Sequence, residues 1–560
     1  MTLKPMGMSR FTLLLALYFV LVINIPLSVR LVTILQHTEG LSLGMVLSLP
    51  LFFGSVFYLL FSLWTFRYLA KPFAVLILLA SSLVSYAMYY YGTVFDMEMI
   101  RNLVETNPGE VHAYLNRNLA LWWLLTGVLP AGLLIAMPLR SRTPLREVAQ
   151  KLVTMSMALL VIVGIAALYY KDYASLGRNN HELNKLIIPT HYLYSAGKFV
   201  SRTYLAPPRA HQAMGEDAMI ADAHPERKKR LLVLVLGETA RARNFELNGY
   251  PRPTNQFTRD LGMVFFRHVS SCGTATAVSV PCLFSRLNRT DYDPGLAKTQ
   301  DNLLDVIQRS GVAVRWLEND GGCKGVCARV PTQAFEPSPG VPLCEGEYCR
   351  DEVLLEGLNA QLAALGDKDA LVVLHLAGSH GPTYNQRYPD AYRRFTPDCP
   401  RSDIQNCSDL QIVNSYDNTL YYDDYVMSRV IALLSEQTQW QTGLLYVSDH
   451  GESLGENGLY LHGMPYALAP EEQTHVPMLL WMSPEFAASP GYDARCIART
   501  AEQETLSHDN VFDAVLGLMQ VETSLYRAQQ DMLRPCRVPE LLAHESREVM
   551  PPEGAPVREG

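Results

Sequence analysis

Five apolar blocks in the first third of the chain constrain its fold more than any other feature. They cover residues 11–31, 44–65, 72–92, 119–138 and 152–170, and each is close to the ~20 residues that a helix needs to cross a bilayer. The full length of 560 residues also exceeds what one core usually supports. The sequence therefore predicts an all-α membrane domain over residues 1–170, with five transmembrane helices, followed by at least one further domain.

Charges around the blocks predict the orientation of this domain. The first block is long for a signal peptide, lacks a small-residue cleavage site and precedes four more blocks, so we expect it to be retained. Lys and Arg gather in the loops between the second and third blocks and between the fourth and fifth, as is typical of cytoplasmic loops. With five spans, everything after Tyr170 is expected on the opposite side of the membrane.

All ten cysteines lie on that exported side, which suits disulfide bonds in an oxidising compartment. Eight are close neighbours in the sequence and two are left over: Cys272 and Cys282, Cys323 and Cys327, Cys344 and Cys349, Cys399 and Cys407, with Cys496 and Cys536 pairing only by elimination. Zinc sites or free buried thiols are the alternative. The "CKGVC" stretch, however, has no partner pair at the spacing of a metal knuckle.

Two segments are predicted to be connectors. Residues 171–230 begin with "HELNKLIIPTHYLYSAGKFV", whose spacing is typical of a helix along the membrane surface, and continue as a Pro- and charge-rich linker. Residues 543–560 are polar and rich in Pro and Gly, which predicts a flexible tail. The net charge of −8 is mild and argues against a nucleic-acid partner.

Residues 231–542 are expected to form the catalytic domain. Short apolar runs alternate there with segments of helical length, and the runs 231–238, 312–320, 370–381, 443–452 and 475–482 are typical of strands buried on both faces. This alternation predicts an α/β domain with a mainly parallel sheet.

Ionisable residues follow several of these strands, where such sheets bind their ligands. Glu238 ends the first strand, His380 follows the apolar residues 371–376 of the third run, and Asp449 and His450 end the apolar residues 444–447 of the fourth. Two carboxylates and one imidazole suit zinc and, less selectively, manganese. Asp-His-Gly is also common in ordinary turns, so the metal hypothesis depends on the combination with Glu238.

The stretch "SSCGTATAVSVPC" (270–282) offers Thr276 as a further metal ligand and nucleophile. Coordination to a dication lowers the pKa of a hydroxyl and delivers an alkoxide at neutral pH. Pro281 is expected to disturb a helix that begins at Thr276, so a Cys272–Cys282 bridge is the alternative support for this loop. An ordinary turn of small residues is the non-functional interpretation.

Three more residues are candidates for contact with phosphate. His380 in "GSHGPTY" and His462 in "LYLHGMPY" lie in Gly-flanked loops and suit phosphate binding, proton transfer or a second metal. Lys324 offers a fixed positive charge to a phosphoryl group. Hydrogen-bonded loop histidines and a surface lysine are the plainer interpretations.

Five long motifs in order resemble one family. They are "GETARARNFELNGYPR" (237–252), "SCGTATAVSVPCLFS" (271–285), "GCKGV" (322–326), "GSHGPTY" (378–384) and "SDHGESLGENGLYLHGMPY" (448–466). Together they resemble the lipid A phosphoethanolamine transferases, the EptA/MCR group of the alkaline phosphatase/sulfatase superfamily, over nearly the whole chain. The chain departs from this family at Glu246, where serine is common.

The resemblance implies an enzyme of the Gram-negative inner membrane that acts as a monomer, with its catalytic domain in the periplasm. One zinc would be tightly bound, with room for a second during turnover. Thr276 would attack phosphatidylethanolamine and release diacylglycerol, and a phosphate of lipid A or lipopolysaccharide would then accept phosphoethanolamine. The added ammonium would weaken the attraction of polymyxin-like cationic peptides.

The resemblance also implies roles for individual residues. The zinc ligands would be Glu238, Thr276, Asp449 and His450, while Lys324, His380 and His462 would contact phosphate or assist proton transfer. Asn102, Thr106 and Glu110 match family residues that contact the ethanolamine head group. Their spacing is expected to place all three on one helical face, which also suits an ordinary interfacial helix.

Other functions differ in what they require. A periplasmic phosphatase or sulfatase would not need five spans, and "CGTAT" stands where sulfatases carry C/S-x-P-x-R. Transfer of phosphoglycerol, or of phosphoethanolamine to another envelope glycan, stays open because pocket shape selects the acceptor. A membrane receptor with a degenerate enzyme fold is disfavoured because every expected ligand type is present.

Overall fold

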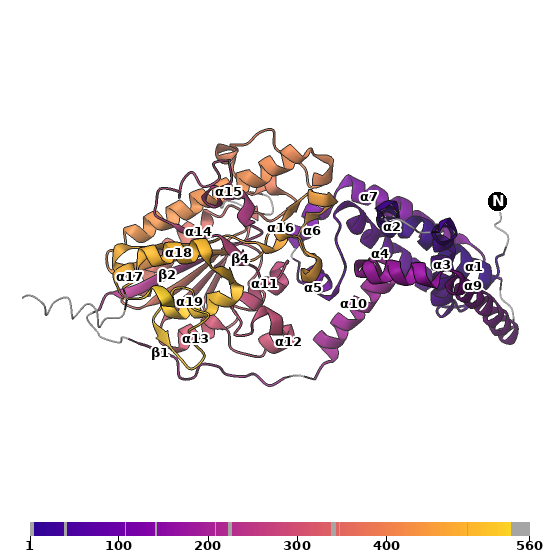
Figure 1. Ribbon diagram of the computed structural model, residues 1–560, viewed down its shortest axis with the longest axis horizontal. Helices are drawn as coiled ribbons and strands as arrows, with labels where there is room; N and C mark the ends of the chain where they lie inside the picture. Colours follow the sequence, from indigo (N-terminus) through magenta and orange to yellow (C-terminus); the bar gives the residue numbers. More distant parts are fainter. Residues whose placement is uncertain are drawn as a thin grey trace, which may run out of the picture. The chain divides into compact units, whose positions relative to one another are not determined.

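A computed structural model describes residues 5–37, 42–106, 108–140, 143–207, 209–221, 227–337, 343–345, 348–489 and 491–538. The tail predicted at 543–560 and the last residues of the predicted catalytic domain lie outside this part. The chain divides into two compact units, coloured along the sequence in Figure 1. The first comprises residues 1–206, 401–409 and 453–468, and the second comprises residues 207–400, 410–452 and 469–560.

The first unit consists mainly of apolar helices long enough to cross a membrane. Four are α3 (Leu43–Ser62), α4 (Ala70–Tyr90), the run Arg117–Ala136 made of α7, η2 and α8, and α9 (Pro144–Asn179). The first predicted block is instead a pair, α1 (Met8–Tyr18) with the π-helical turn η1 (Phe19–Ile23), followed by α2 (Ile25–His37). Within the described residues, four helices can therefore cross a membrane, or five if the pair crosses once.

The bend of 60° between α1–η1 and α2 has a local cause. Asn24 leaves the helical conformation, with φ −90° and ψ 29°, and Pro26 follows in the first turn of α2, where its ring removes a backbone donor. The Asn24 side chain donates to the carbonyl of Ile188 over 2.7 Å and accepts from the amide of the same residue over 2.9 Å. The break is thus stabilised by partners outside the helix.

Shorter elements complete the first unit. They are α5 (Met97–Glu105), α6 (Pro108–Tyr114), α7 (Arg117–Trp123), η2 (Leu124–Val128), α8 (Leu129–Ala136), η3 (His181–Leu186), α10 (Thr190–Val200), η4 (Ser201–Leu205), β11 (Ser453–Leu454) and β12 (Tyr460–Leu461). Thr106 is extended, with ψ 135°, and α6 begins at Pro108. The prediction that Asn102, Thr106 and Glu110 share one helical face is therefore wrong, because α5 ends before the extended Thr106 and a separate helix begins at Pro108.

A seven-stranded mixed sheet forms the centre of the second unit. Its order is β3 (Val264–Phe266), β13 (Met478–Met482), β10 (Trp440–Ser448), β2 (Lys229–Gly237), β9 (Ala370–His375), β5 (Ala313–Glu318) and β6 (Thr332–Ala334). The five strands from β10 to β6 are parallel, whereas β13 is antiparallel to both β10 and β3. The predicted mainly parallel α/β sheet is confirmed.

Helices cover both faces of this sheet (Figure 1). α13 (Leu303–Arg309) and α19 (Val511–Leu518) pack on the face that carries Leu232, Leu234 and Leu236 of β2. α14 (Val353–Leu365) and α15 (Asp409–Ser435) lie on the other face. β2 is buried along nearly its whole length, which explains its continuous apolar sequence.

Small elements surround the sheet, and disulfides join several of them. The remaining helices are α11 (Thr276–Leu283), α12 (Pro294–Ala297), α16 (Glu471–Thr474), α17 (Pro484–Ala488) and α18 (Ala494–Gln503), and β4 (His268–Ser270) pairs with β14 (Thr505–Ser507). The disulfides are Cys272–Cys282, Cys323–Cys327, Cys344–Cys349 and Cys496–Cys536, and Cys399 and Cys407 are also disulfide-bonded.

Candidate metal centre

The carboxyl ends of four adjacent parallel strands bring the candidate residues to one edge of the sheet. Glu238 follows β2, and Asp449 and His450 follow β10. His380 lies five residues after the end of β9, and Asp320 lies two residues after the end of β5. Because these strands run side by side in the same direction, residues far apart in the sequence meet at this edge.

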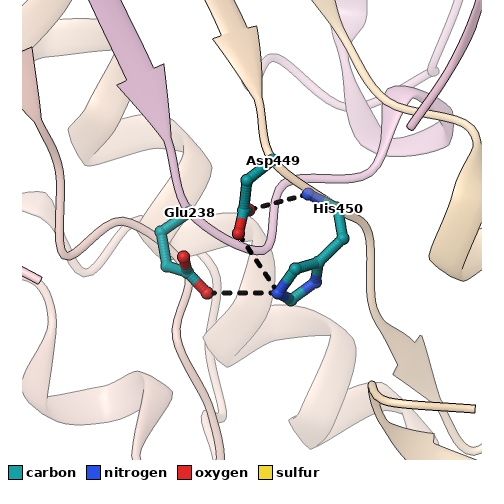
Figure 2. Close-up of side chains that lie close together, drawn as sticks. All are labelled: Glu238, Asp449 and His450. Atoms are coloured by element: carbon teal, nitrogen blue, oxygen red, sulfur yellow. Dashed lines mark hydrogen bonds and ion pairs between the residues drawn. The ribbon is translucent and has the colours of Figure 1, made fainter. Parts of the chain in front are cut away.

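Glu238, Asp449 and His450 form a compact and fully buried cluster (Figure 2). Nε2 of His450 lies 3.5 Å from Oε1 of Glu238 and 3.3 Å from Oδ2 of Asp449. One ligand atom from each residue lies within 4.8 Å of the other two. Figure 2 shows the imidazole facing both carboxylates, which is the arrangement that three ligands of one cation require.

Thr276 is the first residue of α11, and its hydroxyl faces this cluster. Its Oγ1 lies 3.3 Å from each carboxylate oxygen of Glu238 and 3.3 Å from Nε2 of His450. The expectation that Pro281 would disturb a helix starting here is wrong, since α11 runs from Thr276 to Leu283 with Pro281 inside. Pro281 lies near the end of this short helix, so the backbone hydrogen bond that it cannot donate is lost only in the last turns.

Backbone groups orient the ligands of the cluster. Asp449 accepts from the amides of Thr239 and His450 at Oδ1, over 3.1 and 2.7 Å, which leaves Oδ2 facing the cluster. Nδ1 of His450 lies 3.0 Å from the carbonyl of Gly451. A carbonyl only accepts, so Nδ1 carries a proton. When Nε2 gives up its own proton, its lone pair faces the cluster, as metal binding requires.

The backbone around Glu238 is strained and closely packed. Thr239 has φ 60°, a left-handed conformation that is rare for a β-branched residue. Gly378 has φ 48°, and a Cβ at this position would lie 2.8 Å from the carbonyl oxygen of Glu238. Only glycine allows the loop after β9 to approach β2 this closely, and the approach brings His380 toward Glu238.

The two carboxylates of the cluster have opposite pKa shifts. Burial raises the pKa of Asp449 well above its ordinary value, and the charge of Glu238 raises it further. Burial acts in the same direction on Glu238, but the charge of His450 and the hydrogen bond from His380 outweigh it and hold the pKa of Glu238 well below its ordinary value. A divalent cation would compete with the proton on Asp449, so its affinity should rise with pH.

Asp320 was missed by the sequence interpretation and joins a second cluster with His380 and Glu238. Nδ1 of His380 lies 3.3 Å from Oε1 of Glu238 and 3.4 Å from Oδ1 of Asp320. Burial and the nearby charge of Glu238 raise the pKa of Asp320 to about 6. A signal was available in "LEND", since an acidic residue at the end of the predicted strand 312–320 met the criterion applied to Glu238 and Asp449.

A buried pair lies beside Asp320. Glu318, the last residue of β5, accepts from Nε1 of Trp316 over 2.8 Å and from the amide of Asp320 over 2.6 Å. Its Oε2 is 2.8 Å from Nδ1 of His375, the last residue of β9. Nε2 of His375 in turn lies 3.8 Å from Oδ2 of Asp320. Glu318 therefore contacts the backbone of Asp320, and His375 lies near the side chain of Asp320.

The other predicted site residues belong to other segments of the described chain. Lys324 is half-buried, with φ 50°, in the turn closed by the Cys323–Cys327 disulfide. His462 is in the segment 453–468, which belongs to the first unit. Asn102 and Thr106 belong to the same unit. Glu110 is in α6, and its side chain lies outside the described residues. The phosphate and head-group roles of these residues stay predictions.

The donor set fits a divalent cation such as zinc. Oδ2 of Asp449 is buried and, among the described residues, accepts no hydrogen bond from another group. Together with Nε2 of His450, the carboxylate of Glu238 and the hydroxyl of Thr276, it offers four ligand groups, which match the coordination number of zinc. A bound dication would lower the pKa of the Thr276 hydroxyl and make it a nucleophile at neutral pH.

Family models match both parts of the chain. A model described as "Sulfatase" matches residues 230–521, and a model described as "Phosphoethanolamine transferase EptA/EptB" matches residues 53–204. The first covers the sheet and every residue of the two buried clusters. The second covers most of the helices predicted to lie in the membrane.

Individual proteins resemble the whole chain. Phosphoethanolamine transferase EptA of Escherichia coli strain K12 is 42% identical over 538 residues, which cover 95% of this chain and 97% of the relative. Phosphatidylethanolamine transferase Mcr-1 of Escherichia coli is 35% identical over 509 residues, covering 88% and 92%. The solved structure of the integral membrane protein lipooligosaccharide phosphoethanolamine transferase A (EptA) from Neisseria meningitidis has a TM-score of 0.92 and 38% identity, covering 96% of this chain and 100% of that one.

Proposed function

Because the chain belongs to the EptA/MCR family of phosphoethanolamine transferases, within the sulfatase/alkaline phosphatase superfamily, we propose that it transfers phosphoethanolamine from phosphatidylethanolamine to a phosphate of lipid A. The main support is the position of Thr276 Oγ1, 3.3 Å from both Glu238 and His450 at the buried cluster. A nucleophile beside a carboxylate and an imidazole suits phosphoryl transfer through a covalent intermediate.

The proposed reaction has two steps. Thr276 Oγ1 attacks the phosphorus of phosphatidylethanolamine, a P–O bond forms to threonine, and the bond to the diacylglycerol oxygen breaks. Diacylglycerol takes a proton and leaves. An oxygen of a lipid A phosphate then attacks the phosphorus of the phosphoethanolamine on Thr276. A P–O bond forms to lipid A, the P–Oγ1 bond breaks, and Oγ1 takes back a proton. Glu238, Asp449 and His450 would hold zinc, which would lower the pKa of the attacking hydroxyl and withdraw charge from the phosphoryl oxygens.

Other residues are assigned supporting roles. His380, which faces Glu238 and Asp320, together with His462, is proposed to move protons to and from the leaving and attacking oxygens. Lys324 is proposed to contact the phosphoryl group. Asn102, Thr106 and Glu110 are proposed to contact the ethanolamine head group. We place the enzyme as a monomer in the Gram-negative inner membrane, with the second unit in the periplasm, where an anchored enzyme meets both lipids on one surface.

The proposal is tested by searching for the covalent intermediate. The intact chain, loaded with zinc, is incubated with phosphatidylethanolamine vesicles in the absence of acceptor, and the peptide containing Thr276 is analysed by mass spectrometry. The expected result is a mass increase equal to one phosphoethanolamine on Thr276, which disappears when lipid A is added. No adduct under these conditions would reject the covalent mechanism. Loss of the adduct with another envelope glycan but not with lipid A would reassign the acceptor.

Metal removal gives a separate expected result. Dialysis against a chelator should lower both adduct formation and the unfolding temperature of the second unit, because a ligand bound only by the folded state stabilises it by RT ln(1 + [L]/Kd), about 4 kcal/mol at 1,000-fold Kd. Zinc should restore both. The measurement is a thermal unfolding scan with elemental analysis of the same sample. Unchanged unfolding after complete loss of metal would contradict a zinc site at this cluster.

A further inference from the structure

His508 lies between the segment that carries the nucleophile and the segment that carries two metal ligands. It is the first residue of the short helix η13 (His508–Asn510), directly after β14. β14 pairs in parallel with β4, and Ser507 lies opposite Ser270. From Ser270 the chain continues to Thr276, so the position of His508 is fixed beside the start of the nucleophile segment.

The imidazole of His508 makes one hydrogen bond to each segment. Its Nδ1 accepts from the amide of Cys272 over 3.1 Å. Its Nε2 lies 2.9 Å from the carbonyl of Ser448, the residue before Asp449. Because an amide only donates and a carbonyl only accepts, one neutral tautomer with the proton on Nε2 satisfies both bonds.

Burial keeps His508 in this form. The side chain is 2% exposed, and burial lowers its pKa to about 3, so the ring is neutral throughout the physiological range. Ser279 of α11 strengthens the same link, since its hydroxyl donates to the carbonyl of Asp449 and lies 3.4 Å from Nδ1 of His508. The segment that carries Thr276 and the segment that carries Asp449 and His450 are therefore joined through two buried side chains, His508 and Ser279.

We propose that His508 is a positioning residue that fixes the segment carrying Thr276 against the segment carrying Asp449 and His450. This inference rests on the proposed role of Thr276 as the nucleophile. Its two hydrogen bonds go to backbone atoms, the amide of Cys272 and the carbonyl of Ser448, so it acts through the backbone of the two segments. Phosphoryl transfer depends on such positioning, because a displacement of about 1 Å costs on the order of 100-fold in rate.

Three substitutions separate the two hydrogen bonds. His508→Leu removes both while filling a similar volume. His508→Asn retains a polar group near the Nδ1 position, and His508→Gln retains one near the Nε2 position. A matched control is Asn510→Leu in the same short helix. Asn510 accepts from the amide of Ser507 and donates to the carbonyl of Gln530, each over 2.9 Å, so neither of these hydrogen bonds goes to the two segments that His508 joins.

The readout is the rate of adduct formation on Thr276 in the intact, zinc-loaded chain, measured at several concentrations of phosphatidylethanolamine. For His508→Leu we expect the maximal rate to fall by about 10- to 100-fold with an unchanged KM and unchanged zinc content. His508→Asn and His508→Gln should retain intermediate rates. Asn510→Leu should lower the unfolding temperature by a similar amount and leave the rate within about twofold, since it removes the same number of hydrogen bonds.

Three outcomes would overturn the inference. The first is an unchanged rate in folded His508→Leu. The second is an equal rate loss in Asn510→Leu, which would assign the effect to general destabilisation. The third is loss of zinc in proportion to the loss of rate, which would show that His508 acts only by holding the metal-binding segment. If the parent chain itself forms no adduct, the proposed function fails instead, so the two failures are distinguishable.

Discussion

Replacement of Thr276 by alanine is expected to lower phosphoethanolamine transfer by about 1,000-fold or more, the order found when a covalent nucleophile is removed. The Thr276 hydroxyl lies 3.3 Å from Glu238 and from His450, and Thr276→Ala deletes the atom proposed to attack phosphorus. The measurement is the mass of lipid A from membranes that contain each variant, together with the initial rate of transfer in vesicles.

Thr276→Ser is the matched control for this substitution. Serine retains the hydroxyl and removes only a methyl group, so Thr276→Ser should retain a measurable rate and form an adduct at position 276. Thr276→Ala should still bind zinc, because the other three proposed ligand side chains remain. A parental rate of lipid A modification in folded, zinc-loaded Thr276→Ala would reject the nucleophile assignment, whatever the similarity to known transferases.

The sheet could be predicted from sequence because its signal is local. β2, β9 and β10 are buried on both faces, and parallel strands of this kind appear as continuous apolar runs. The order of the strands could not be predicted, since it depends on which helices cross which face. The apolar blocks likewise predicted helices long enough to span a bilayer, but composition alone did not reveal that the first helix is broken at Asn24 and Pro26.

The site could be predicted where a residue that can bind a metal stands at the end of a predicted strand. Glu238, Asp449 and His450 met both criteria. Asp320 also met them and was missed because it was treated as part of its strand. His508 carried no such signal, since its role depends on the pairing of β14 with β4, two short strands far apart in the sequence. Long-range backbone partners of this kind are visible only in the fold.

The second large effect is expected at Glu318. This carboxylate accepts hydrogen bonds from Trp316, Asp320 and His375, and the side chains of Glu318 and His375 are 5% and 0% exposed. Burial alone would raise the pKa of Glu318, but the charge of His375 holds it at about 2. Burial alone would lower the pKa of His375, but Glu318 raises it to about 9. Both groups are therefore charged in the folded protein.

The signs of these shifts define a pH window. The contribution of Glu318 is fully present above its unfolded pKa of about 4.3 and is lost as the pH falls through about 2. The contribution of His375 is fully present below its unfolded pKa of about 6.5 and is lost as the pH rises through about 9. The pair should therefore stabilise the fold most between about pH 4.3 and 6.5.

Glu318→Gln is expected to lower the free energy of unfolding of the second unit by about 3 kcal/mol at pH 6, because removing one partner of a buried pair leaves the other charge uncompensated. The measurement is a double-mutant cycle with His375→Gln, read from hydrogen exchange of the amides of β5 and β9 in the intact chain. The coupling between Glu318 and His375 should shrink above pH 9, where the imidazole loses its proton. A coupling that is absent at pH 6, or equal at pH 6 and pH 10, would show that these side chains are held by packing around Trp316 and not by their charges.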